Sequence, residues 1–161
     1  MLLLSLFFCT ITKTALALSS DLSKSLSSEE KSWLAANQNS IRYAPNPSWP
    51  PGDYVENAVH KGIVSDYIRI FEEKLGVKFQ RTYFNKWHEI ISALKNADTD
   101  FAGAIQETEE RKQHMLFTSV FLKTHLSVII QQSAPDDFAA KLNSATLACP
   151  RGYTTVDYVR S

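Results

Sequence analysis

The sequence predicts an α/β fold in which helices cover both faces of a mainly parallel sheet. Two observations support this prediction. The 161 residues are 44% hydrophobic and 21% charged, which is typical of a globular domain with a core. Between residues 41 and 114, short β-prone runs alternate with helical patterns. Ligands of such sheets bind at the carboxyl ends of the strands, so we expect the loops after Tyr43, Tyr83 and Ile105 to line one site.

The N-terminal segment is typical of export. Residues 1–11 are almost wholly apolar but too few to cross a bilayer of about 30 Å as a helix. Ala15-Leu16-Ala17 fits an A-x-A cleavage pattern. No Lys or Arg precedes the apolar run, so either the amino terminus supplies the positive charge or the true start lies upstream. We predict a signal peptide over residues 1–17, a Ser-rich linker over residues 18–28 and a periplasmic location.

The first predicted helix begins at a capping box. Ser27 is suited to the N-cap position and Glu30 to the third helical position, where each side chain can bond the other residue's backbone N–H. We expect this helix to end near Asn37, with Trp33 and Leu34 on its buried side.

A strand over residues 41–44 is followed by a proline-rich loop. Four of the six prolines fall within residues 45–52, which predicts a stiff loop at the surface. Residues 54–56 favour a short strand, and residues 57–61 favour a turn.

The clearest helix lies between Gly62 and Gly76, and Gly76 is suited to end it. Residues 77–83 alternate like a strand, and residues 87–96 have the pattern of a second helix. The apolar residues at helical spacing are Ile63, Tyr67, Ile68, Phe71 and Leu75 in the first helix, and Trp87, Ile90, Ile91 and Leu94 in the second.

The remaining elements are shorter. They are a strand over residues 100–105, a helix capped by Thr108 and ending at His114, a β-rich run over residues 122–131, a helix over residues 135–142, a strand over residues 146–149 and a helix from Thr154 onward.

Three polar segments follow strands and are candidates for ligand contacts. Asn46 and Trp49 stand on the proline-rich loop, where a rigid aromatic ring can stack on a ligand, although Trp49 could instead cap the core. Arg111 follows Thr108 at a helix start, where it can grip a carboxylate with two hydrogen bonds. The alternative there is a simple cap followed by solvated charges. Thr154 and Thr155 offer hydroxyl donors, or only a further helix cap.

Several short motifs follow one another along the chain: Trp49-Pro50-Pro51-x-x-Tyr54, Gly62-Ile63-Val64-Ser65-Asp66-Tyr67, Trp87-x-x-Ile90-Ile91-x-x-Leu94, Asp100, Thr108-x-x-Arg111 and Leu116-Phe117-Thr118. In this order, they resemble family 3 of the bacterial extracellular solute-binding proteins, which have the type-two periplasmic binding (flytrap) fold. The resemblance covers residues 41–118 and extends more weakly to Tyr158. Residues 26–34 also resemble the lead-in of sensor versions attached to histidine kinases or cyclases.

The resemblance implies a two-lobed protein that closes on an amino acid or similar solute. It implies that Arg111 grips the ligand carboxylate, that Trp49 stacks on the ligand, and that Thr154 or Thr155 contributes a hydroxyl from the second lobe. Gln106 matches a position that often bears Ser or Thr, and Asn46 a position that is often Asp. Gly52 stands where the family usually has Phe. The last two departures place a standard amino acid in doubt, but not a ligand with a carboxylate.

The resemblance also divides the chain into lobes. Residues 29–123 match the first lobe, and residues 124–161 match a hinge crossing and the beginning of an incomplete second lobe. We therefore expect exposed apolar surface on residues 128–130 and 146–149, and a tendency to aggregate.

Charge and motif content exclude several other classes of protein. Lys plus Arg and Asp plus Glu number 17 each, so no overall positive field favours nucleic acid. The four histidines have no metal-ligand spacing, and no Gly-rich phosphate loop is present. With Cys9 in the predicted signal, Cys149 remains alone and no internal disulfide is expected. We predict no catalytic residues, metal or cofactor.

Three functions remain, and the first is favoured. The chain would bind a small molecule, an amino acid or related carboxylate, outside the cytoplasm for uptake through an ABC permease. Alternatively, it is the sensing domain of a histidine kinase or cyclase with an attached transmembrane signalling region. The third possibility is an enzyme on the same fold, such as a dehydratase.

Overall fold

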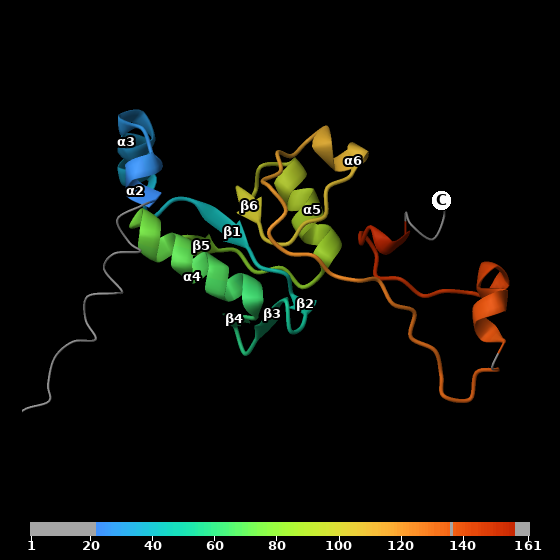
Figure 1. Ribbon diagram of the computed structural model, residues 1–161. Helices are drawn as coiled ribbons and strands as arrows, with labels where there is room; N and C mark the ends of the chain where they lie inside the picture. Colours follow the sequence, from blue (N-terminus) through green and yellow to red (C-terminus); the bar gives the residue numbers. More distant parts are fainter. Residues whose placement is uncertain (1–21, 136, 157–161) are drawn as a thin grey trace, which may run out of the picture.

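The computed structural model describes residues 22–135 and 137–156 (Figure 1). The predicted signal peptide lies outside these residues. The helices and strands are α2 (Leu22–Ser25), α3 (Ser28–Asn37), β1 (Arg42–Ala44), β2 (Ser48–Trp49), β3 (Asp53–Glu56), β4 (Val59–Lys61), α4 (Ile63–Leu75), β5 (Gln80–Arg81), α5 (Trp87–Lys95), β6 (Phe101–Ala102), α6 (Glu109–Lys112) and the 3₁₀ helix η1 (Phe138–Ser144). Helix α2 lies within the predicted linker, and the helix predicted from Thr154 is described only as far as Val156.

A three-stranded parallel sheet lies at the centre of the fold, with β1 between β5 and β6. Tyr43 of β1 pairs with Arg81 on one side and with Phe101 on the other. Parallel neighbours need crossover connections, which α4 and α5 supply. The predicted parallel sheet is confirmed, although β5 and β6 are shorter than the strands expected over residues 77–83 and 100–105.

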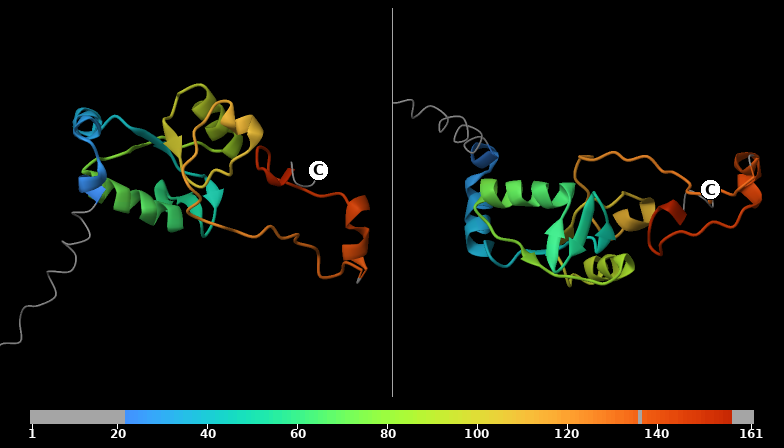
Figure 2. Two further views of the ribbon diagram at one scale, coloured as in Figure 1. Left: turned by 45° about the horizontal axis from the view of Figure 1, so that its top comes forward. Right: turned by 90° about the horizontal axis from the view of Figure 1, so that it is seen from below.

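Helices α4 and α5 cover opposite faces of this sheet, as predicted (Figure 2). Neighbouring residues of β1 divide the core between them. Tyr43 packs with Val64 of α4, whereas Ala44 packs with Trp87 and Ile90 of α5. Successive side chains of a strand point to opposite faces, so this one buried strand supports two small cores.

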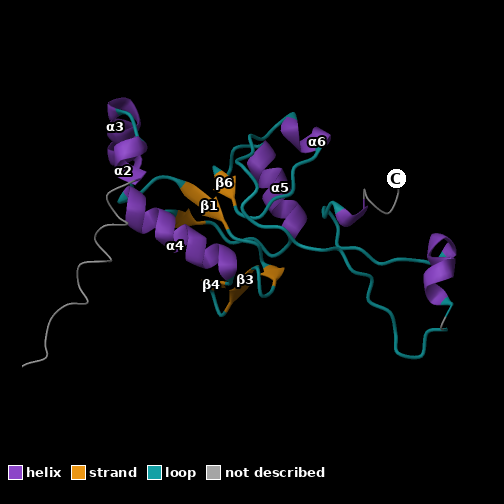
Figure 3. Cartoon of the chain, viewed as in Figure 1, coloured by secondary structure: helices purple, strands orange, loops and turns teal. Residues whose placement is uncertain are grey.

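A second sheet, formed by the antiparallel strands β2, β3 and β4, lies beside α4 (Figure 3). Only β3 was expected from the sequence, because β2 falls in the predicted proline-rich loop and β4 in the predicted turn. Asn57 and Ala58 have positive φ angles of 53° and 59° and form the two-residue turn that joins β3 to β4. Glycine is the usual second residue of such a turn, so Asn57-Ala58 gave no hairpin signal.

Helix α3 has the predicted capping box but not the predicted buried face. The Ser27 hydroxyl accepts the Glu30 N–H at 3.1 Å, and the Glu30 carboxylate accepts the Ser27 N–H at 2.7 Å. Leu34 packs against the core on the α4 side, but Trp33 is 57% exposed, so its predicted burial is wrong. The helix packs against the core through Leu34, and Trp33 is not part of this contact.

The segment after α6 differs most from the prediction. Helix α6 ends at Lys112 rather than His114, and no strand forms over residues 122–131 or 146–149. A strand needs a neighbour for its N–H and C=O groups, and no strand of the described chain lies beside either run. Figure 1 shows this segment running away from the sheet to η1 and returning towards α5.

The expected apolar exposure on residues 128–130 is confirmed, and Ile129 is 96% exposed. In the second run, Leu147 and Cys149 are half-buried. None of the helices in the described ranges is both long and apolar enough to cross a membrane.

Candidate ligand-binding site

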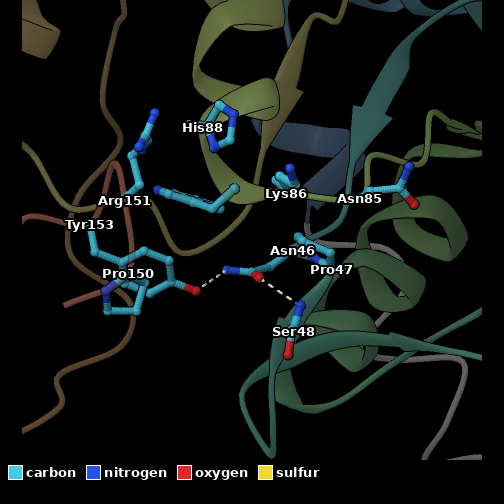
Figure 4. A pocket seen from close by; sticks show the side chains of 10 residues that line it. Asn46, Pro47, Ser48, Asn85, Lys86, His88, Pro150, Arg151 and Tyr153 are labelled. Carbon is cyan, nitrogen blue, oxygen red and sulfur yellow. Dashed lines mark hydrogen bonds between the residues drawn. The ribbon is translucent and has the colours of Figure 1, made fainter. Parts of the chain in front are cut away.

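A pocket of about 570 Å³ lies where the chain leaves β1, where α5 begins, and where the chain returns after η1 (Figure 4). Residues 46–48, 85–88, 150, 151 and 153 line it. Two of the three loops expected to share a site, those after Tyr43 and Tyr83, therefore contribute to this pocket. The loop after Ile105 does not line the pocket, but Arg111, which follows it in α6, donates to the carbonyl of Gly152 next to the lining residues Arg151 and Tyr153.

Asn46 forms a buried, fixed part of the pocket wall. Its side-chain oxygen accepts the backbone N–H of Ser48 at 3.0 Å, and its NH₂ group donates to the Tyr153 hydroxyl at 3.4 Å (Figure 4). Because the oxygen is occupied by a donor on its own loop, the amide presents its donor side towards Tyr153.

A cluster of buried polar side chains holds the loop that carries Asn46 in place. His60 Nε2 and Asp53 Oδ1 are 2.6 Å apart, and the other Asp53 oxygen accepts the Asn46 N–H at 3.3 Å. The Tyr43 ring lies 5.4 Å from the His60 ring. Burial, reinforced by the Asp53 carboxylate, raises the pKa of the Tyr43 hydroxyl well above its usual value, so Tyr43 stays neutral.

Sequence reasoning missed this cluster. His60 showed only that the histidines lack metal-ligand spacing, and Asp53 gave no signal of its own. The two side chains meet only because β3 pairs with β4. The hairpin gave no turn signal, so nothing in the sequence indicated their proximity.

Arg111 is held in place by its own helix and by the returning chain. Thr108 caps α6, and its hydroxyl accepts the Arg111 N–H at 3.2 Å. The side chain is nearly buried, and its guanidinium donates to the Gln106 carbonyl at 2.7 Å and to the Gly152 carbonyl at 2.8 Å. Gly152 lies between two residues that line the pocket, so Arg111 stands directly behind the lining.

The Gly152 carbonyl joins three parts of the site. It accepts hydrogen bonds from Arg111 and from the indole N–H of Trp87, the latter at 2.9 Å. The Trp87 ring also packs on Tyr153, with 5.5 Å between ring centroids. From the sequence, Trp87 was expected only as an inward-facing apolar residue, because helical spacing gives no information on the partner of its N–H.

The remaining predicted contact residues are Gln106, Thr154, Thr155 and Trp49. The Thr154 hydroxyl donates to the side-chain oxygen of Gln106, which places both residues beside Arg111. The hydroxyl of Thr155 is buried and has no hydrogen-bond partner within the described residues. Trp49 does not line the pocket: its ring covers Gly52, where an added Cβ would lie 2.6 Å from the ring.

The structure therefore gathers Gln106, Arg111 and Thr154 around Gly152, with Asn46 linked to them through Tyr153. Among the described residues, no group of three or more His, Cys, Asp or Glu side chains is arranged to hold a metal ion.

Residues 41–151 of the chain match the bacterial extracellular solute-binding proteins, family 3. The chain belongs to this family. The match confirms the type-two fold, and the two cores on either side of β1 belong to its first lobe. In this family-3 domain, the pocket lies at the carboxyl end of β1, the edge of the sheet predicted to bind ligand.

Two relatives of this family-3 domain are sensor proteins. The virulence sensor protein BvgS of Bordetella pertussis is 23% identical over 133 residues, which are 83% of this chain and 11% of that protein. The sensor protein EvgS of Escherichia coli K12 is 25% identical over 129 residues, which are 80% of this chain and 11% of that protein. The chain thus spans about a tenth of the length of either relative.

One solved structure is also similar. It is an ancestral cationic amino acid solute-binding protein (AncCDT-1), with 23% sequence identity and a TM-score of 0.42. The similarity covers 52% of this chain and 36% of that one.

Proposed function

We propose that this family-3 domain binds a small polar solute that carries a carboxylate, outside the cytoplasmic membrane. The observation that carries the proposal is Arg111, whose nearly buried guanidinium lies behind the pocket lining and bonds two neutral carbonyl oxygens. Hydrogen bonds from a guanidinium to a carboxylate are about twice as strong as those between neutral groups, and two can form in parallel. A ligand carboxylate is therefore a stronger acceptor for this guanidinium than the Gly152 carbonyl is.

Other polar groups of the site would add hydrogen bonds to the same ligand. Asn46 offers its NH₂ group, and Thr154 and Gln106 already lie beside Arg111. The Thr155 hydroxyl, which has no hydrogen-bond partner among the described residues, is a further donor. Thr108 acts through the position of α6 rather than by contact with the ligand. We leave Trp49 out of the proposed contacts because its ring packs on Gly52.

For the role in the cell, we propose that the domain senses its ligand rather than delivering it for uptake. The sequence alone favours delivery to an ABC permease and keeps sensing as the alternative. Both sensor relatives match at least four-fifths of the chain, which favours a domain whose occupancy is read by an attached signalling region. Solute binding defines the family, so we propose no catalytic role.

Arg111→Lys tests the binding proposal, because it keeps the positive charge and removes the two-pronged donor. A thermal-shift screen of amino acids and dicarboxylates first selects the best ligand, and calorimetry then measures its affinity. We expect Arg111→Lys to weaken binding about tenfold or more, equivalent to about 1.4 kcal/mol. Arg69→Lys, on the exposed side of α4, is the matched control and should bind like the wild type.

Circular dichroism of Arg111→Lys shows whether the variant is folded. Unchanged affinity in a folded variant would exclude the carboxylate grip. In cells that carry the variant, a sensing role predicts a lost transcriptional response to the ligand with normal uptake of labelled ligand. A transport role predicts lost uptake.

A further inference from the structure

The pocket lining carries positive side chains from two different segments. Lys86 comes from the start of α5 and Arg151 from the returning chain, and the His88 side chain also lines the pocket. Figure 4 shows these three side chains above Asn46 and Tyr153. No Asp or Glu is among the described residues that line the pocket. The lining as a whole therefore favours negative charge.

Asn46 adds donors rather than acceptors to this lining. An asparagine side chain can offer a ligand either its oxygen or its NH₂ group. Here the backbone N–H of Ser48 occupies the oxygen, and the NH₂ group faces Tyr153. A ligand ammonium that approaches this wall meets N–H groups, whereas a ligand oxygen meets groups that can donate to it.

The two nearby carboxylates are engaged elsewhere. Glu89, in the first turn of α5, accepts the backbone N–H groups of Asn85 and Lys86, both at 3.1 Å. Asp53 is buried behind Asn46 and bonds His60. Neither Glu89 nor Asp53 lines the pocket. A ligand ammonium would therefore be desolvated beside cations without a carboxylate to receive it, which is unfavourable.

We infer that the ligand is a small dicarboxylate without an ammonium group, and that the pocket discriminates against the corresponding amino acids. This inference rests on the proposed binding function and names the class of ligand for the same site. One carboxylate bonds Arg111. The second lies against the pocket lining that carries Lys86, Arg151 and Asn46.

Two matched pairs of ligands test this inference, since each pair differs only by an ammonium group: succinate with aspartate, and glutarate with glutamate. Calorimetry on the 161-residue chain should show that the better dicarboxylate binds at least tenfold more tightly than its amino partner. Equal or tighter binding of the amino partner would overturn the inference and leave the proposed function intact. Failure of the chain to bind any amino acid or dicarboxylate would overturn the proposed function itself.

A double variant identifies the source of the discrimination. Lys86→Gln with Arg151→Gln removes two exposed cations of the lining, and both changes are compatible with folding because the side chains lie at the surface. We expect the ratio of dicarboxylate to amino acid affinity to fall several-fold, towards one. Lys31→Gln removes an exposed cation from α3, outside the pocket, and should leave the ratio unchanged. An unchanged ratio in the double variant would show that these cations do not select the ligand.

Discussion

Glu72 lies on the buried face of α4, where its carboxylate binds the adjoining strand. It accepts the Phe79 N–H at 2.9 Å and two hydrogen bonds from Arg81, at 2.6 and 3.1 Å. Burial raises the pKa of Glu72, but the hydrogen bonds from Arg81 and Phe79 outweigh that effect and hold the pKa below its usual value. This single side chain therefore couples α4 to β5 in a charge-dependent way.

Glu72→Gln should lower the free energy of unfolding at pH 7 by about 2 kcal/mol, because hydrogen bonds to a charged group are lost. A carboxyl whose pKa is lowered by folding stabilises the fold above its unfolded pKa, near 4.5 here, and stops doing so as the pH falls through the folded pKa. The difference between wild type and variant should therefore shrink below pH 4.5. Urea unfolding at pH 7 and at a pH well below 4.5 measures it.

The control for this prediction is Glu73→Gln, on the exposed side of the same helix. Its ion pair with Arg69 is exposed to solvent, so we expect a change below about 0.5 kcal/mol at either pH. If the Glu72→Gln difference were the same at both pH values, Glu72 would not carry the acid dependence.

The sequence predicted the role of a single residue correctly where that role depends on residues close to it in the chain. The Ser27 and Thr108 caps depend on neighbours three residues away, and both form as predicted. The Asp53–His60 pair, the Glu72–Arg81 pair and the bond from Trp87 to Gly152 depend on tertiary packing. Periodicity shows which face of an element is apolar, but not which polar group lies opposite a buried polar side chain.

At the scale of elements, α6 shows how a short helix positions a functional side chain. It has only four residues, and so short a helix has little intrinsic stability. Its start is held by the Thr108 hydroxyl, which accepts the N–H of Arg111 itself. The cap and the proposed carboxylate donor are therefore parts of one turn.

Thr108→Ala should remove the cap at a cost of about 1 kcal/mol, which loosens the turn that presents Arg111. We expect ligand affinity to fall about fivefold, the equivalent of that free energy, when measured by calorimetry with the ligand chosen for the Arg111 experiment. Thr108→Ser keeps the hydroxyl and should bind like the wild type. Equal affinities in the two variants would mean that the cap has no influence on the site.

The order of β1, α4, β5, α5 and β6 could be predicted because each element has its own hydrophobic pattern and residues that favour its start or end. Gly76, for example, ends α4 with a φ of 68°, a left-handed conformation that glycine adopts without strain. The strands predicted after residue 120 did not form, because a β-prone run becomes a strand only when another strand pairs with it. For the whole molecule, the sequence thus predicted the first lobe, but not the conformation of the segment that leaves it.

That segment gives the molecule an exposed apolar surface. The side chains of Leu116, Val120, Leu126 and Ile129 are more than 60% exposed, and they lie on chain that makes no ladder hydrogen bonds. Extended apolar chain with unpaired backbone groups is a template for association with a second chain. We therefore expect the 161-residue chain to self-associate through these residues.

Ile129→Lys tests this expectation at the most exposed of the three residues 128–130. Burial of one isoleucine side chain contributes about 2 kcal/mol, so the variant should weaken association about thirtyfold, measured by sedimentation across a concentration series. Gln131→Lys adds the same charge two residues away without removing apolar surface, and should weaken association much less. Equal effects would point to net charge as the cause, whereas a selective effect of Ile129→Lys, with unchanged ligand affinity, would separate the associating surface from the binding pocket.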